Sequence, residues 1–180
     1  MRAILTLMLW LGGIGFAQAY EAAYPMTAAG FCEIKALPAG TILRTSSQKA
    51  YFDGNNGLFM RLFRTINENK VPMTVPVEAK MKPGTMIFYL DPGSVPRQDL
   101  KLPKGVARQN VPERTVASIG IRGEYSRESY EKNLEKLREW IKTQGNVQVA
   151  GEPYAVYWNS PFTLPFLKRS EIHLPVQKTK

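Results

Sequence analysis

Residues 70–77 read KVPMTVPV, residues 157–166 read YWNSPFTLPF, and residues 168–172 continue as KRSEI. The first pattern is rich in β-branched residues, which favour an extended strand. Its two prolines each remove a backbone donor and indicate an edge or a bulge in that strand. The second pattern is an apolar, Pro-rich loop that leads through a basic pair into a strand. Neither places a nucleophile beside a base, so the two patterns indicate binding before catalysis.

Together the two patterns resemble the SOUL haem-binding family. In that family a helix leads into an M-T-x-P-V strand, and the chain ends with a Y-N-x-P loop, a basic pair and an N-E-V-like strand. The match covers about residues 26–177, with MTVPV at 73–77. This chain departs from the pattern at Leu164, where a Lys is common, and at Ser170, which replaces an Asn. The resemblance implies a pseudo-twofold barrel that holds haem in a cleft between the first helix and the late loop.

The chain also contains a weak internal repeat. LPAGTI at 37–42 and VPERTV at 111–116 share an apolar-Pro-x-x-Thr-β-branched frame, offset by 111 − 37 = 74 residues. In each half the expected order is strand, strand, helix, strand, strand. This order predicts an α+β fold in which a curved antiparallel sheet or distorted β-barrel carries two helices on its outside. The two related halves, at about 26–95 and 105–177, are expected to form one domain.

Two amphipathic helices follow from apolar residues at helical spacing. The first is preceded by cap-competent side chains at 53–57, and its apolar stripe consists of Leu58, Phe59, Leu62, Phe63 and Ile66. The second covers about 127–143, with Ser126 as its N-cap and Gly145 as its stop. Strands are expected near 33–37, 40–46, 73–80, 85–90, 106–111, 115–122, 147–150, 153–158 and 170–176.

The residue inventory argues against an enzyme. The chain has one His and one Cys, and it contains no G-x-S-x-G, H-E-x-x-H, P-loop or Gly-rich dinucleotide turn. Cys32 therefore allows neither an internal disulfide nor covalent haem attachment, and we expect it to pack as a small hydrophobe. By strand alternation His173 faces away from Ile172 and Leu174, so we expect an exposed histidine rather than an iron ligand.

A candidate tetrapyrrole site follows from what a porphyrin needs, namely a flat apolar surface with cations near its two propionates. The first helix and the late loop together offer both kinds of side chain. The apolar candidates are Phe59, Met60, Phe63, Phe162, Leu164 and Phe166, and the basic ones are Arg61, Arg64, Lys168 and Arg169. No residue is singled out as an axial metal ligand, so the haem would be held non-covalently and reversibly. The late loop is so rich in apolar side chains that it should either pack on the body of the protein or bind a ligand.

The N-terminus predicts export. Arg2 precedes an apolar run at 3–11, and Ala17-Gln18-Ala19 fits a signal-peptidase site, so residues 1–19 are expected to be cleaved. The run is shorter than the ~20 residues of a membrane span. Residues 20–180 would then form a single periplasmic or secreted domain.

The charge of the chain bears on its partners. The formal net charge is +9, and outside the cytoplasm this favours anionic small molecules or an anionic membrane surface over nucleic acid. A monomer is expected. Two other functions stay open. The protein could bind another amphiphile, as the gyrase-inhibitor-like effector domains that it also resembles do, or act as an envelope-associated structural or stress protein.

Overall fold

The computed structural model describes residues 21–54 and 57–179. The predicted signal peptide, residues 1–19, lies outside the described residues. The other expected helices and strands are observed within a few residues of their predicted bounds. In chain order they are β1 (Glu21–Ala22), β2 (Cys32–Leu37), β3 (Gly40–Ser46), α1 (Leu58–Glu68), β4 (Thr74–Val75), β5 (Val77–Lys80), β6 (Thr85–Tyr89), β7 (Val106–Val111), β8 (Arg114–Arg122), α2 (Arg127–Lys142), β9 (Val147–Val149), β10 (Tyr154–Tyr157), the 3₁₀ turn η1 (Pro165–Leu167) and β11 (Arg169–Lys178).

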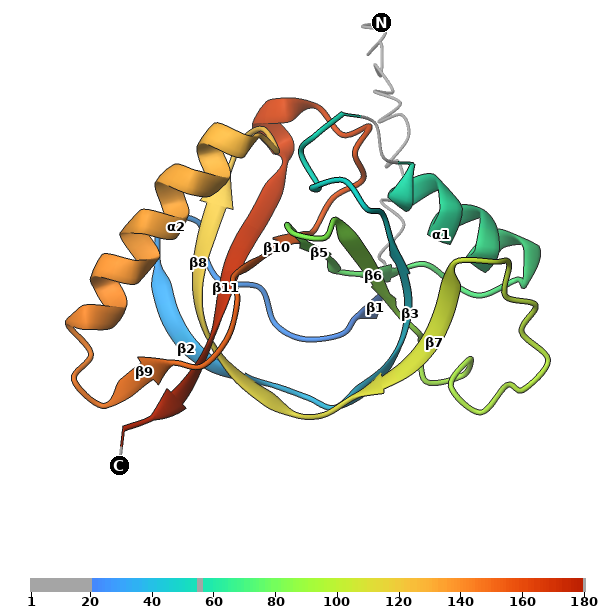
Figure 1. The fold of residues 1–180 in the computed structure, drawn as a ribbon, viewed down its shortest axis with the longest axis horizontal. Helices are drawn as coiled ribbons and strands as arrows, with labels where there is room; N and C mark the ends of the chain where they lie inside the picture. The colour runs from blue at the N-terminus through green and yellow to red at the C-terminus, as the bar shows by residue number, and fades with distance from the viewer. Residues whose placement is uncertain (1–20, 55–56, 180) are drawn as a thin grey trace, which may run out of the picture.

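Nine strands form one curved antiparallel sheet, in the order β2-β8-β11-β10-β5-β6-β3-β7 with β9 added to β11. The sheet is not closed into a ring, because the path begins at β2 and ends at β7. Both α-helices lie on its convex outside, α2 over the half with β8 and β11 and α1 over the half with β3 and β6 (Figure 1). The predicted α+β class is therefore confirmed, with an open, curved sheet.

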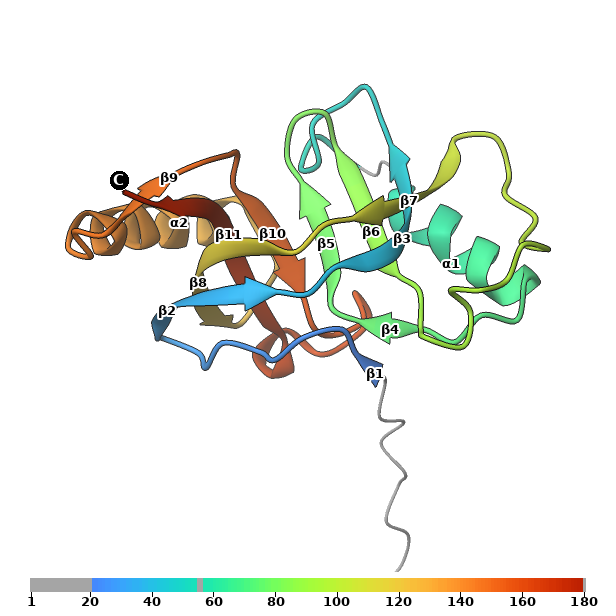
Figure 2. The ribbon, with the colours of Figure 1, turned by 90° about the horizontal axis from the view of Figure 1, so that it is seen from below.

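The repeated frame lies where two long strands bend from one half of the sheet into the other. β2 continues into β3 past Pro38, and β7 continues into β8 past Pro112 (Figure 1). The bent strands pair with each other along both arms (Figure 2), with Leu37 opposite Arg114 and Gly40 opposite Val111. Since each bent strand contributes to both sides of the sheet, the two halves share backbone hydrogen bonds within one sheet.

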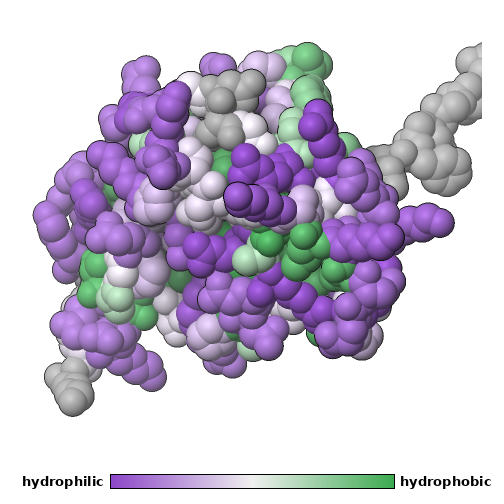
Figure 3. Space-filling model, turned by 45° about the vertical axis from the view of Figure 1, so that its right-hand side comes forward, coloured by the Kyte–Doolittle hydropathy of each residue, from purple (hydrophilic) through white to green (hydrophobic). Residues whose placement is uncertain are grey.

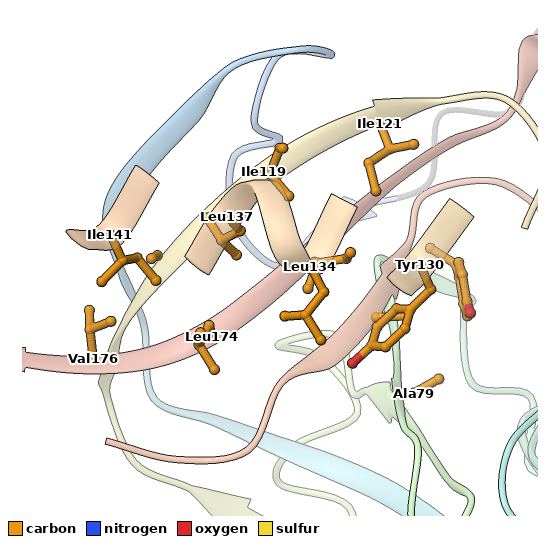
Figure 4. Close-up of a cluster of buried hydrophobic side chains, with 13 residues drawn as sticks. Ala79, Ile119, Ile121, Tyr130, Leu134, Leu137, Ile141, Leu174 and Val176 are labelled. Carbon is orange, nitrogen blue, oxygen red and sulfur yellow. The ribbon is translucent and has the colours of Figure 1, made fainter. Parts of the chain in front are cut away.

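Two clusters of buried apolar side chains lie under the helices on the convex face, and a third lies on the concave face around Tyr24 and Val156. The predicted stripe of α2 is buried as expected and packs on β8 and β11 (Figure 4); its members are Tyr130, Leu134, Leu137 and Ile141. Ser126 caps this helix, since its side chain accepts a hydrogen bond from the Ser129 amide. Cys32 is half-buried against the same cluster, and burial raises its thiol pKa, as suits an inert packing residue.

The start and the inner face of α1 differ from the expectation. The helix begins after Gly57, whose φ of +64° is left-handed, and its N-cap makes no side-chain bond. Asp53, one of the cap-competent residues, instead forms an ion pair with Arg127 of α2. Leu62 is fully buried, whereas Phe59 and Phe63 are only half-buried at the edge of the core. No helix among the described residues is long and apolar enough to cross a bilayer.

The predicted strand at 73–80 is interrupted at Pro76, which cannot donate to a ladder. β4 leaves the main sheet and pairs in parallel with β1, while β5 stays between β6 and β10. This pairing brings the chain that follows β1 across the concave face of the sheet (Figure 1).

That crossing segment corrects the expectation for His173. The residue does face away from Ile172, but it is 0% exposed rather than solvated. The covering segment supplies Tyr24, whose ring lies 5.7 Å from the imidazole, and Thr27, which bonds to Glu171. His173 Nε2 lies 2.6 Å from a Glu171 carboxylate oxygen, and Nδ1 lies 3.3 Å from the Tyr154 hydroxyl. Strand alternation gave the correct face but could not show what covers it.

The buried pair of His173 and Glu171 makes the free energy of unfolding depend on pH. Burial lowers the pKa of His173 below its ordinary 6.5. Burial alone would raise the pKa of Glu171, but His173 and Lys35 lower it from 4.5 to about 2. As pH falls, the unfolded chain takes up both protons before the folded chain does, so the free energy of unfolding should decrease from pH 6.5 down to about 2.

Urea unfolding at a series of pH values measures this loss of stability. The His173→Gln variant keeps a hydrogen-bonding side chain but cannot titrate, so its stability should be flat between pH 6.5 and 4.5, where the wild-type protein weakens. Equal pH profiles for the two proteins in that window would contradict the assignment.

Candidate functional site

A groove lies between α1 and the late loop, which we define as residues 158–168 between β10 and β11. Its volume is about 120 Å³, below the several hundred Å³ of pockets that enclose a drug-sized ligand. It is lined by Phe59, Phe63, Met73, Val75, Val77, Tyr157, Trp158, Asn159, Ser160 and Phe162. The predicted meeting of the first helix and the late loop is thus present in the fold.

The helix wall of the groove is a pair of stacked rings. Phe59 and Phe63 stand one turn apart, so they share one flank of α1. Their ring centroids are 5.7 Å apart at an interplanar angle of 14°. Phe59 also meets Phe88 of β6 edge-on at 5.6 Å, which fixes it against the core. The result is a flat, half-exposed aromatic surface.

The late loop is anchored at its base by hydrogen bonds. Asn159 Oδ1 accepts from the Arg169 amide at 2.6 Å, and the Tyr125 hydroxyl donates to the Arg169 carbonyl at 2.8 Å. The Trp158 indole donates to Glu171 at 2.8 Å, which ties the first residue of the loop to the buried carboxylate. The base is therefore held in place independently of the tip.

The tip of the loop leaves its apolar side chains in water. Phe162 is 81% exposed, Phe166 63% and Leu164 56%. The sequence left two alternatives for this loop, packing on the body of the protein or an exposed surface that awaits a ligand. The tip is exposed and does not pack on the body. Elsewhere, on the face that α1 occupies, apolar surface is broken into small patches between hydrophilic side chains (Figure 3).

The predicted site residues divide into two groups. Phe59, Phe63 and Phe162 line the groove together. The other candidates lie outside its lining. Met60, Leu164 and Phe166 are exposed, and the exposed Arg61 donates to the Thr45 hydroxyl at 3.0 Å.

The remaining basic candidates lie outside the groove as well. Arg64 is exposed on α1, Lys168 lies over the Tyr125 ring, and Arg169 reaches the carbonyls of Leu167 and Lys168. None of the four basic candidates is therefore a lining residue of the groove.

Sequence reasoning missed the sheet wall of the groove. Met73, Val75 and Val77 come from the first sequence pattern, and Tyr157 and Trp158 come from the second. The sequence did contain a signal for this wall, because these residues belong to the two patterns at 70–77 and 157–166. Met73, Val75 and Val77 alternate along the chain, but nothing in the sequence showed that β5 and β10 are neighbours.

Comparison with known proteins identifies the class. The sequence matches the family described as SOUL heme-binding protein over residues 20–175. The chain belongs to the SOUL heme-binding protein family, which confirms the resemblance seen in the sequence. No curated protein has a significantly similar sequence.

Solved structures share the fold at low identity. EcmrR in a complex with DNA has a TM-score of 0.62 at 16% identity, covering 83% of this chain and 58% of that one. The separate EcmrR C-terminal domain has a TM-score of 0.58 at 15% identity, covering 83% and 98%. An uncharacterized conserved protein from Listeria innocua has a TM-score of 0.61 at 14% identity, covering 83% and 93%. This chain spans little more than half of the full EcmrR chain, and these likenesses establish the fold alone.

Proposed function

We propose that this protein is a non-enzymatic binding protein that holds haem or a related tetrapyrrole reversibly on the surface formed by α1 and the late loop. The observation that carries the proposal is the exposed apolar tip of a firmly anchored loop beside an aromatic groove. Exposed apolar patches on a monomeric protein commonly mark a ligand or partner surface. Membership of the SOUL heme-binding protein family supports a tetrapyrrole as the ligand.

The size of the groove sets the binding mode. At about 120 Å³ it is too small to enclose a porphyrin, so only one edge of the ring would enter between Phe63 and Phe162. Phe166 would cover part of a ring face from the loop. A ligand held largely on an open surface can dissociate without a rearrangement of the protein, which suits reversible binding.

The charged and metal-binding groups fit a ligand held mainly through its ring and propionates. Arg64 on α1, Lys168 at the end of the loop and Arg169 at the start of β11 supply cations for the propionates, whereas Arg61 is held by Thr45 of β3. His173 is buried and hydrogen-bonded, so it cannot reach the groove. Haem would bring an iron centre with redox and ligand-binding chemistry. The role of this chain is to shield and carry the ring.

Loss of the loop phenylalanines should weaken haemin binding. The double variant Phe162→Ser/Phe166→Ser removes two rings, and burying a Phe fully contributes about 1.5–3 kcal/mol, so an affinity loss of about tenfold or more is expected. Haemin titration followed by the Soret band measures it. Phe31→Ser is the matched control, because Phe31 is 68% exposed and lies outside the groove lining. Absence of saturable micromolar binding by the wild-type protein would refute the proposed function.

Charge reversal on α1 should weaken binding of the propionates. Arg64→Glu replaces an exposed cation on α1, the helix that forms one wall of the groove, with an anion, and surface charge pairs contribute about 0.2–1 kcal/mol, so an affinity loss of about 1.4-fold to fivefold is expected at low salt. The loss should shrink as salt is raised. Arg138→Glu on α2 makes the same charge change far from the groove and should leave the haemin titration unaltered.

We propose in addition that the protein acts outside the cytoplasm. The basic start, the apolar run at 3–11 and the Ala17-Gln18-Ala19 site support a cleaved signal peptide. Protein recovered from the host envelope or medium should have an intact mass that begins at residue 20. Recovery of the uncleaved chain from the cytoplasmic fraction would contradict this proposal.

A further inference from the structure

The tip of the late loop, residues 161–167, exposes more apolar surface than the groove uses. Leu167 is 49% exposed and joins Phe162, Leu164 and Phe166, each of which is more than half exposed. Of these four side chains only Phe162 lines the groove. η1 lies at the upper end of the molecule in Figure 1, beyond the end of β8. Large apolar side chains are therefore gathered in water at one end of the protein.

Charge is absent from the tip and mostly positive at its base. The sequence has no Asp, Glu, Lys or Arg from residue 153 to residue 167. Lys168 and Arg169 follow directly, and Arg122 at the end of β8 donates to a carbonyl of the tip at 3.3 Å. The turn that follows β8 adds one exposed carboxylate, that of Glu124. Three cations against one carboxylate make the base of the tip electropositive.

The backbone of the tip has few amide groups that need water. Two of the residues at 161–169 are prolines, which have no amide proton. Five amides of the same stretch already donate hydrogen bonds within the loop, namely those of Phe162, Thr163, Leu167, Lys168 and Arg169. A backbone amide without a partner is strongly unfavourable in a bilayer, so this loop loses little when it leaves water.

The charges at the base favour one kind of partner over another. A second copy of this chain, docked tip to tip, would bring the same cations against one another. An anionic lipid surface instead complements them, and it has an apolar layer directly beneath its headgroups to accept the tip.

We infer that the tip of the late loop anchors the protein on the surface of an anionic bilayer. The apolar side chains of residues 162–167 enter the boundary between headgroups and acyl chains, and Arg122, Lys168 and Arg169 lie among the lipid phosphates. Neither signal is strong alone, and stable peripheral binding takes the two together. Because Phe162 also lines the groove, the docked protein holds the groove at the lipid surface.

Flotation with lipid vesicles tests the anchor. The test uses residues 20–180, which contain every described helix and strand and lack the apolar run at 3–11. Vesicles of phosphatidylcholine with about a quarter phosphatidylglycerol should bind this protein at least about tenfold more tightly than vesicles of phosphatidylcholine alone. Added salt should weaken the binding to the anionic vesicles.

Two pairs of variants separate the apolar and the charged contributions. Leu164→Ser/Leu167→Ser should reduce vesicle binding about tenfold or more, because both side chains lose their burial in lipid. Its matched control is Leu102→Ser/Val149→Ser, which removes two exposed apolar side chains outside the loop and should float as the wild-type protein does. Arg122→Glu should weaken binding to the anionic vesicles about fivefold or more, whereas Arg138→Glu on α2 should not.

The depth of the tip can be measured as well. Leu164→Trp places an indole at the tip, and lipids with brominated acyl chains should quench its fluorescence. Leu102→Trp is the control, since it has the same native tryptophans but a reporter outside the loop, and its added fluorescence should not be quenched.

Vesicle binding is measured without haemin, and haemin binding is measured without vesicles, so the anchor and the proposed function can fail separately. Absence of vesicle binding, equal binding with and without phosphatidylglycerol, or equal binding by Leu164→Ser/Leu167→Ser and its control would overturn the anchor. A dimer in solution that the same double variant dissociates would overturn it too, because a second copy would then cover the tip.

Discussion

The buried carboxylate of Glu171 organises the rest of the structure. One of its oxygens accepts from the Thr27 amide and the Trp158 indole, and the other lies within 2.7 Å of Ser118 Oγ, Lys35 Nζ and His173 Nε2. These donors come from the segment that crosses the concave face, from β2, β8 and β11, and from the start of the late loop. A buried charge without such partners would be strongly destabilising, so the network requires all of these elements to be in place together.

A second buried carboxylate lies two strands away in the same row of the sheet. Val156 of β10 is paired with Glu171 on one side and Glu78 on the other, so both carboxylates face the concave side. Lys35 balances the first and Arg114 the second. The first network uses its donors fully and holds the base of the late loop, whereas the second leaves Arg114 Nη1 unpaired beside a large cavity. Each of the two carboxylates thus has a counter-ion from another strand of the sheet, Lys35 from β2 and Arg114 from β8.

The sequence was sufficient for the local elements because their signals are local. The stripe of α2, its Ser126 cap and the proline interruption at Pro76 each depend on a few neighbouring residues. The contents of the concave face depend on distant ones. Glu78 meets Arg114 across 36 residues and Tyr24 across 54, and no spacing rule links them. For the same reason His173 was assigned to the correct face but the wrong environment. The candidate groove was foreseen from α1 and the loop, but its sheet wall was not.

The two bent strands have a consequence for how such a fold arises. β2 and β3 find their partners β8 and β7 in the other half of the chain. An isolated first half would leave these backbone groups unpaired, and a second copy of the same half would have to supply the complement. The second half of the present chain supplies that complement itself. The two halves differ at their last hairpin, whose connection spans residues 81–84 in the first half and residues 158–168 in the second, so only the second half carries the late loop.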